Sequence, residues 1–287
     1  MSWSRFIRFV DDKDQVRLGD AVVDSPEELA TLLEAGNLTA VELVGKDLFD
    51  ATSTGKVVQY VAYPLPEPQP PLETLRLLSL ATPVKETGRS PPPYPSIFIK
   101  PSRSISGWNN DIPIPKIAQK DQLDYEGELA IVIGKEGKDI LAEEALEYVA
   151  GYTVANDVSA RTWQRDPKYA GEVPQWCFSK GFDSFAPLGP AIVSPKVLGA
   201  ADDLVLQTKV NGKVRQEAST SDLVFGVKKI VSFVSQGTTL EKGSVILTGT
   251  PGGVALGMKP PQWLTDGDTV EVSISEIGTI RNRMVFQ

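Results

Sequence analysis

The chain has 287 residues, of which 41% are hydrophobic and 23% are charged, and its formal net charge at pH 7 is -8. This length suffices for one large domain, or for a large domain with a small one. An acidic chain without a run of Lys or Arg is poorly suited to nucleic acid or to anionic membranes, and no apolar stretch approaches the roughly 20 residues that span a bilayer.

The sequence contains no histidine and a single cysteine, Cys177. One cysteine cannot form an intrachain disulfide, and the N-terminal residues lack the apolar core of a signal peptide, so we expect a reducing, cytoplasmic location. The absence of histidine excludes Ser-His and Cys-His nucleophiles and His-ligated zinc. Any chemistry must therefore depend on carboxylates, Lys, Arg, Tyr, Ser, Thr or a hard metal ion.

Residues 1–70 are predicted to form a small α/β domain. FIRFV and DAVVD are typical of short strands. The segment SPEE at 25–28 has the pattern of a capping box, with Gly36 as the helix stop, and TAVE at 39–42 predicts a second helix that ends near residue 50. The Pro-rich segments YPLPEPQPPLETL and GRSPPPYPSIFIKP follow, so we expect the domain boundary near residue 70.

Residues 71–287 are predicted to form a larger domain dominated by antiparallel sheet. The segments that predict strands are FIKP, ELAIVIG, GYTVAND, DLVLQTKV, SVILTGTP and DTVEVSISEIGTIRNRMVF. Asn211 and Gly212 indicate a hairpin turn, and AEEALEYVAG and DLVFGVKKIVSFVSQG predict helices. The expected fold class is therefore α+β, mixed and mainly antiparallel.

Two glutamates lie within an apolar strand predicted over 123–134, LDYEGELAIVIG. Side chains two residues apart share a face of a strand, so Glu126 and Glu128 point the same way. Two carboxylates in an apolar setting need compensation, which a divalent cation such as Mg²⁺, Mn²⁺ or Ca²⁺ would provide. The alternative is a solvated edge of the sheet, at which both glutamates face water.

Three further segments carry candidate polar groups, and each also has a purely structural interpretation. Asp157 ends the strand GYTVAND and could serve only as a helix N-cap, with Arg161 one helical turn further on. Lys180 precedes Gly181 in SKGFDSFAPLGP, and a lone Lys is usually solvated. The segment LTGTPGGVALG offers backbone N–H groups and the Thr250 hydroxyl to an anion, but it lacks the ending of a P-loop.

Taken together, six motifs resemble the fumarylacetoacetate hydrolase superfamily, in order from about residue 96 to 284. They are DYEGELAIVIGK, GYTVANDVSARTWQ, KGFDSFAPLGP, VNGKVRQ, ILTGTPGGV and DTVEVSISEIGTIRN. The resemblance implies a β-roll catalytic domain, usually in a homodimer, that uses Mg²⁺ or Mn²⁺ to cleave, decarboxylate or isomerise oxo acids and diketo acids. The residues that it implies are Glu126, Glu128 and Asp157 as metal ligands, Lys180 and Arg161 as catalytic residues, and Gln164, Gly249 and Thr250 on the substrate side.

One segment departs from the family pattern. Members usually carry a segment similar to C-I-G-L-N-Y-x-x-H-A before F-x-K-P, and its histidine helps to activate water in the hydrolases. Here the chain reads LLSLATPVKETGRSPPPYPSIFIKP, so the KETG fragment is present while the strand and the histidine before it are expected to be missing. The usual general base for water is therefore absent.

The sequence thus predicts a metal-dependent enzyme that acts on a small oxo- or diketo-dicarboxylic acid through a stabilised enolate. Hydrolysis, decarboxylation and keto-enol isomerisation all remain open, and only hydrolysis requires an activated water. The first alternative is a catalytically weakened or silent member that keeps the fold and the metal site. The second is a sugar-acid lyase or dehydratase on the same scaffold.

Overall fold

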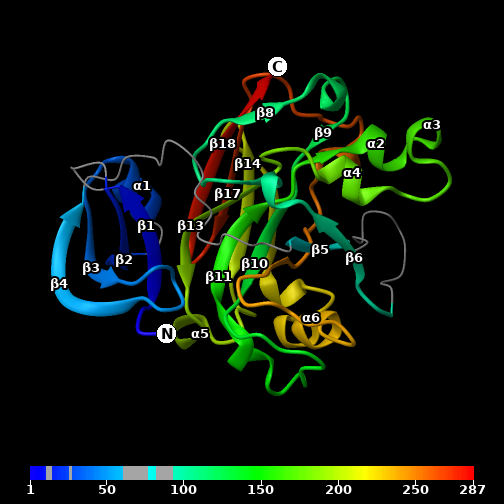
Figure 1. Cartoon of the computed structure of the whole chain (residues 1–287). Coiled ribbons are helices and arrows are strands. Elements are labelled where there is room, and N and C mark those ends of the chain that lie inside the picture. Colours follow the sequence, from blue (N-terminus) through cyan, green and yellow to red (C-terminus); the bar gives the residue numbers. More distant parts are fainter. Residues whose placement is uncertain (11–14, 26–27, 61–76, 82–92) are drawn as a thin grey trace.

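The computed structural model describes residues 1–10, 15–25, 28–60, 77–81 and 93–287, and most of its strands belong to one mixed, mainly antiparallel sheet (Figure 1). In spatial order, that sheet contains β4 (Thr52–Tyr60), β3 (Leu38–Val44), β2 (Val16–Val22), β1 (Arg5–Val10), β13 (Ala186–Val193), β11 (Val149–Asn156), β10 (Gly127–Ile133), β16 (Val245–Leu247), β5 (Leu77–Ala81) and β6 (Ser96–Lys100). The short β7 (Ile105–Ser106) pairs with β13 off this path.

A second sheet packs against the first. Its strands, in order, are β15 (Lys213–Ser219), β14 (Val205–Val210), β17 (Thr269–Ile274), β18 (Gly278–Phe286) and β8 (Ile112–Ile114), and a separate pair is formed by β9 (Leu123–Asp124) and β12 (Ser159–Ala160). The helices are α1 (Leu29–Glu34), α2 (Arg161–Arg165), α3 (Pro167–Ala170), α4 (Trp176–Lys180), α5 (Pro195–Leu198) and α6 (Val227–Val234). Few helices and predominantly antiparallel pairing make the fold α+β, as the sequence predicted.

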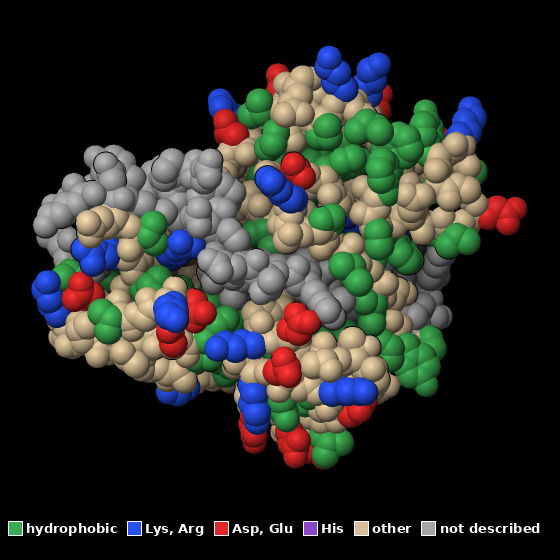
Figure 2. Space-filling view, in the orientation of Figure 1, with side chains coloured by type: hydrophobic (Ala, Val, Ile, Leu, Met, Phe, Trp, Pro, Cys, Tyr) green, Lys and Arg blue, Asp and Glu red, His purple; other side chains and the backbone are tan. Residues whose placement is uncertain are grey.

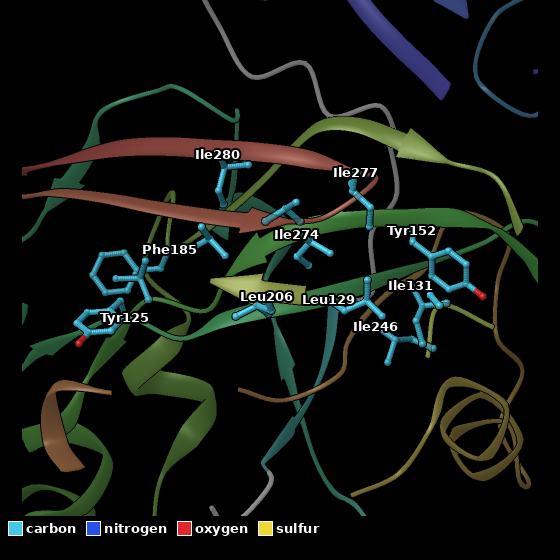
Figure 3. Close-up of a cluster of buried hydrophobic side chains, with 14 of the residues drawn as sticks. Tyr125, Leu129, Ile131, Tyr152, Phe185, Leu206, Ile246, Ile274, Ile277 and Ile280 are labelled. Atoms are coloured by element: carbon cyan, nitrogen blue, oxygen red, sulfur yellow. The ribbon is translucent and has the colours of Figure 1, made fainter. Parts of the chain in front are cut away.

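Strand β10 is buried along its whole length, because each of its faces contributes to a different core. Leu129 and Ile131 belong to the cluster that fills the space between the two sheets (Figure 3). Ala130 and Val132 point the other way, into the cluster that also contains Leu247. The absence of a solvent face in the sequence pattern is explained by this two-sided burial.

The N-terminal strands continue the large sheet, since Phe6 of β1 pairs with Ile192 of β13. Two predictions are corrected here. Residues 39–42 do not begin a helix: they lie in β3, between β2 and β4, because alternating burial in that strand outweighs the capping pattern. The first helix ends at Glu34 with Gly36 at φ +67 just after it, as predicted, but it begins only at Leu29, with Glu28 as its N-cap residue.

Three predictions in the larger domain also need correction. The strand expected over 123–134 is divided into β9 and β10, with residues 125 and 126 between them. The helix expected in AEEALEYVAG is one 3-10 turn at Ala145–Tyr148, after which β11 begins. The strand expected to be missing before KETG is present as β5, which pairs in parallel with β16 and antiparallel with β6.

Of the other predicted features, some are confirmed and some fall on residues that the structure does not describe. Asn211 and Gly212 form the turn between β14 and β15, and α6 occupies the second helix predicted in the larger domain. The KETG fragment, the Pro-rich segment YPLPEPQPPLETL and the domain boundary predicted near residue 70 lie outside the described residues. The boundary therefore stays a prediction.

Gly127 offers a test of the packing beneath β10. A Cβ at this position would come closer to Thr208 Oγ1 than van der Waals contact allows and would lie 3.0 Å from Val272 Cγ1. We therefore expect Gly127→Ala to lower the free energy of unfolding by about 1–3 kcal/mol in urea denaturation. Gly226→Ala is the control, because its Cβ would enter open space. Equal stability of the two variants would contradict this packing argument.

Candidate active site

Strands β10 and β11 bring three carboxylates together at one end of their pairing. Glu126 precedes β10, Glu128 is its second residue, and Asp157 follows β11 directly. The strands are antiparallel, with Gly127 opposite Asn156, so these positions lie next to one another. One carboxylate oxygen from each of the three acids lies within 4.8 Å of the others. The structure thus groups the three residues that the sequence analysis proposed as metal ligands.

Backbone contacts fix this corner. The Asp157 N–H donates to the Glu126 carbonyl at 2.9 Å, and the Glu126 N–H donates to Asn156 Oδ1 at 2.9 Å. Because these bonds lock the Glu126 and Asp157 backbones to each other, the spacing of the carboxylates does not depend on a flexible loop. Asn156 was missed by the sequence analysis, although it stands beside Asp157 in the strand motif.

Glu128, like Asp157, is fully buried. Its Oε2 accepts the Gly249 N–H at 2.6 Å, while its Oε1 has no hydrogen-bond partner among the described residues. Burial, followed by the charges of Asp157 and Glu126, raises the pKa of Glu128 well above its usual value. A divalent cation would offset this cost and give Oε1 a partner, and three carboxylates are the oxygen ligands that Mg²⁺ and Mn²⁺ prefer. The residues present therefore fit such an ion.

Two lysines balance the negative charge of the Asp157 carboxylate. The Lys180 Nζ lies 2.7 Å from Asp157 Oδ2 and 2.7 Å from Glu126 Oε2, and the Lys100 Nζ lies 2.5 Å from Asp157 Oδ1. Burial by itself would raise the pKa of Asp157, but the two ammonium groups outweigh it and lower that pKa. Burial would likewise lower the pKa of Lys180, yet Asp157 and Glu126 raise it, so Lys180 stays protonated.

Lys100 is a site residue that the sequence analysis missed. Its Nζ also donates to the Phe185 carbonyl at 2.8 Å, and burial lowers its pKa against the raising effect of Asp157. The signal was present in the strand SIFIK: alternation places Lys100 on the same face as buried Phe98, so its side chain points inward.

Arg161 occupies the other side of Glu126. Its Nη2 lies 2.6 Å from Glu126 Oε1, its Nε lies 2.8 Å from Asp124 Oδ2, and its Nη1 donates to Gln164 Oε1 at 3.0 Å. Burial alone would lower the pKa of Arg161, but the carboxylates of Asp124 and Glu126 raise it. Asp124 was also missed, although its spacing of two and four residues from the glutamates was visible.

The glycine-rich segment at residues 247–257 forms hydrogen bonds with the beginning of β10. Gly249, at φ +95, directs its N–H to Glu128, and the Thr250 hydroxyl donates to the Gly127 carbonyl at 3.0 Å. Gln216 donates to Thr250 Oγ1 at 2.7 Å and accepts the Gly127 N–H at 3.0 Å. Gly249 and Thr250, predicted to face the substrate, thus also hold the strand that carries the glutamates. Gln216 was missed, although it ends the motif VNGKVRQ.

The family model described as "Fumarylacetoacetate (FAA) hydrolase C-terminal" matches residues 76–285. Because it covers most of the chain, the protein belongs to this family, and it is an enzyme of the fumarylacetoacetate hydrolase type. A solved fumarylacetoacetate hydrolase from Exiguobacterium antarcticum is 32% identical, with a TM-score of 0.78 over 99% of this chain and 100% of the other. A 2-hydroxyhepta-2,4-diene-1,7-dioate isomerase from Mycobacterium marinum is 34% identical, with a TM-score of 0.77 over 99% of both chains.

Curated relatives carry a more specific name. "Oxaloacetate tautomerase fahd2, mitochondrial" from Xenopus laevis is 45% identical over 194 residues, which are 68% of this chain and 59% of the relative. "Oxaloacetate tautomerase YisK" from Bacillus subtilis is 39% identical over 193 residues, which are 67% of this chain and 62% of the relative. The matched segment is therefore about three fifths of the length of these relatives. No helix in the described part of this chain is long and apolar enough to cross a membrane.

The triad leads to a direct prediction for metal binding. We expect Glu126→Gln combined with Asp157→Asn to abolish the binding of Mg²⁺ or Mn²⁺, because two of the three anionic ligands are lost. Titration calorimetry should show one site per wild-type chain and none in the variant. Asp111→Asn with Glu143→Gln is the control: it removes two negative charges from exposed positions. Unchanged affinity in the triad variant would contradict the assignment.

Proposed function

We propose that this protein is a divalent-metal-dependent enzyme that interconverts the enol and keto forms of a small oxo-dicarboxylic acid, with oxaloacetate as the first candidate. The observation that carries the proposal is the carboxylate triad with an unpartnered buried oxygen on Glu128, surrounded by the cations of Lys180 and Arg161. The names of the relatives support the choice of substrate and reaction. When bound by the triad, Mg²⁺ or Mn²⁺ would stabilise negative charge on the enolate oxygen.

The chain's own residues have separable roles in this reaction. Arg161 and Lys180 supply the positive charge that binds the substrate's carboxylates. Keto-enol exchange moves one proton between the enol oxygen and the α-carbon, which is bonded to the carbonyl carbon. The site therefore needs a protonated group beside the enolate that gives its proton to the carbon and regains one from the oxygen. We assign that proton to the Lys180 Nζ, because Glu126 and Asp157 keep this group protonated. Lys100, which is directed at Asp157 and the Phe185 carbonyl, acts only through Asp157.

The lack of histidine separates the three reactions that the sequence left open. Hydrolysis of a C–C bond needs an activated water, and the chain has no imidazole to accept its proton. Tautomerisation and decarboxylation proceed through an enolate without water. Asp157 is paired with both Lys180 and Lys100, whose charges lower its pKa, so its carboxylate is a weak base in this network. Of the two enolate reactions that remain, the relatives' names favour tautomerisation.

The test compares the three reactions in one Mg²⁺ buffer, each corrected for the metal-only rate. We expect enol-keto exchange of oxaloacetate to be fastest, and acylpyruvate hydrolysis to be slower by ~10² to 10⁴, the usual contribution of a general base. Lys180→Met should abolish tautomerisation, while Lys168→Met, a change on α3 outside the site network, should not. Hydrolysis as fast as tautomerisation would refute the proposal. A wild-type chain that binds Mg²⁺ but accelerates none of the reactions would favour the catalytically silent alternative.

We further propose a homodimer formed through the larger domain and, given a single cysteine, a reducing cytoplasmic location. The mitochondrial location belongs to the names of the vertebrate relatives. Hydrophobic side chains gather in the upper right of Figure 2, over the region of α2 and α4 in Figure 1. Within residues 161–180, which include these helices, the side chains of Tyr169, Val173 and Phe178 are exposed. Such apolar surface is typical of an interface. Light scattering should give twice the chain mass at micromolar concentration, and a monomer would contradict the proposal.

A further inference from the structure

Asp124 is a fully buried carboxylate outside the triad, and its side chain bonds to Arg161 and to backbone N–H groups next to the site. Oδ2 accepts from Arg161 Nε at 2.8 Å and from the Leu256 N–H at 3.1 Å, while Oδ1 accepts from the N–H groups of Ala255 at 2.7 Å and Tyr125 at 2.8 Å. A carboxylate has about four lone-pair sites, so its accepting capacity is used. Asp124 is thus unsuited to binding a metal or a substrate itself.

The contact with Asp124 fixes the direction of the Arg161 guanidinium. A guanidinium has five N–H groups, and the contacts to Asp124, Glu126 and Gln164 each use one. In the described part of the chain, one N–H on each terminal nitrogen remains beyond these contacts. Each of these N–H groups can donate to a carboxylate oxygen of a ligand.

The same carboxylate attaches Arg161 to the glycine-rich segment. Ala255 and Leu256 begin the 3-10 turn at Ala255–Gly257, and their N–H groups end on Asp124. The adjacent Tyr125 hydroxyl donates to the Gly253 carbonyl at 2.8 Å. Further back in the same segment, Gly249 holds Glu128. Residues 249–256 therefore link Arg161, through Asp124, to Glu128, the proposed metal ligand that Gly249 holds.

We propose that Asp124 is a positioning residue that orients Arg161 for one carboxylate of the substrate. This inference rests on the proposed function only in that it takes Arg161 to bind a substrate carboxylate. The competing explanation is that Asp124 merely stabilises the turn at 255–257. The two differ in one respect: a positioning effect must pass through Arg161, whereas a structural effect must persist when Arg161 is changed.

A double-mutant cycle separates them, with oxalate binding to the Mg²⁺-loaded protein as the readout. A hydrogen bond to a charged group contributes roughly 1.5–3 kcal/mol, so we expect Asp124→Asn to weaken oxalate binding about tenfold or more. KM for oxaloacetate should rise similarly, with kcat and Mg²⁺ affinity within about threefold of wild type. Added to Arg161→Gln, the same change should alter oxalate affinity less than about twofold, because its target is already gone.

Asp111→Asn is the matched control, since Asp111 also pairs with an arginine, Arg283, but on the surface. It should leave oxalate affinity unchanged. Equal effects of Asp124→Asn with and without Arg161 would overturn the inference, as would a parallel loss of Mg²⁺ affinity. If urea denaturation shows that Asp124→Asn does not fold, Asp124→Glu takes its place in the cycle. This variant should lose less oxalate affinity, and that loss must also disappear in the Arg161→Gln background. Wild-type protein that binds oxalate but does not turn over oxaloacetate would reject the proposed reaction, while the cycle still decides the role of Asp124.

Discussion

Compensation of buried negative charge is the constraint on which the site depends. Strands β10 and β11 bring one carboxylate oxygen each of Glu126, Glu128 and Asp157 within 4.8 Å, and Glu128 and Asp157 are fully buried. Uncompensated, such a cluster would be strongly destabilising. Lys100, Lys180 and Arg161 are therefore not independent site residues. Each is paired with a carboxylate of the triad, and Glu128 Oε1, which has no partner among the described residues, is a position that a bound cation would satisfy.

The scaffold makes this arrangement possible by burying β10 on both faces. One face packs between the two sheets (Figure 3), and the other contributes Ala130 and Val132 to a second buried cluster. Strands β11 and β16 pair with its two edges, so the strand is held on all sides. Gly127 lets the strand approach Thr208, and Gln216 and Thr250 bond to its backbone. A site built on such a rigid strand places its charges more precisely than a loop does. The function that we propose uses this precision to stabilise one enolate.

The types of residue at the site restrict the possible reactions more than the geometry of the site does. The chain has no histidine, so the site contains charges that bind and stabilise an enolate but no usual base for water. The structure adds that β5 occupies the place where a strand was expected to be missing. The strand before KETG is thus present, whereas the chain contains no histidine.

The sequence by itself determined the α+β class and the turn at Asn211 and Gly212, and alternation placed Glu126 and Glu128 on one face, because alternation along a strand is a local property. Asp157 joined them as a proposed ligand only through the family resemblance, and the structure brings the three acids together. It did not determine that residues 39–42 form a strand, since pairing with β2 and β4 overrides the local capping pattern. Only the tertiary structure revealed Lys100, Asp124 and Gln216 as partners of the site. Their contacts join segments as far as 131 residues apart, and such contacts depend on how the sheets pack rather than on any nearby sequence.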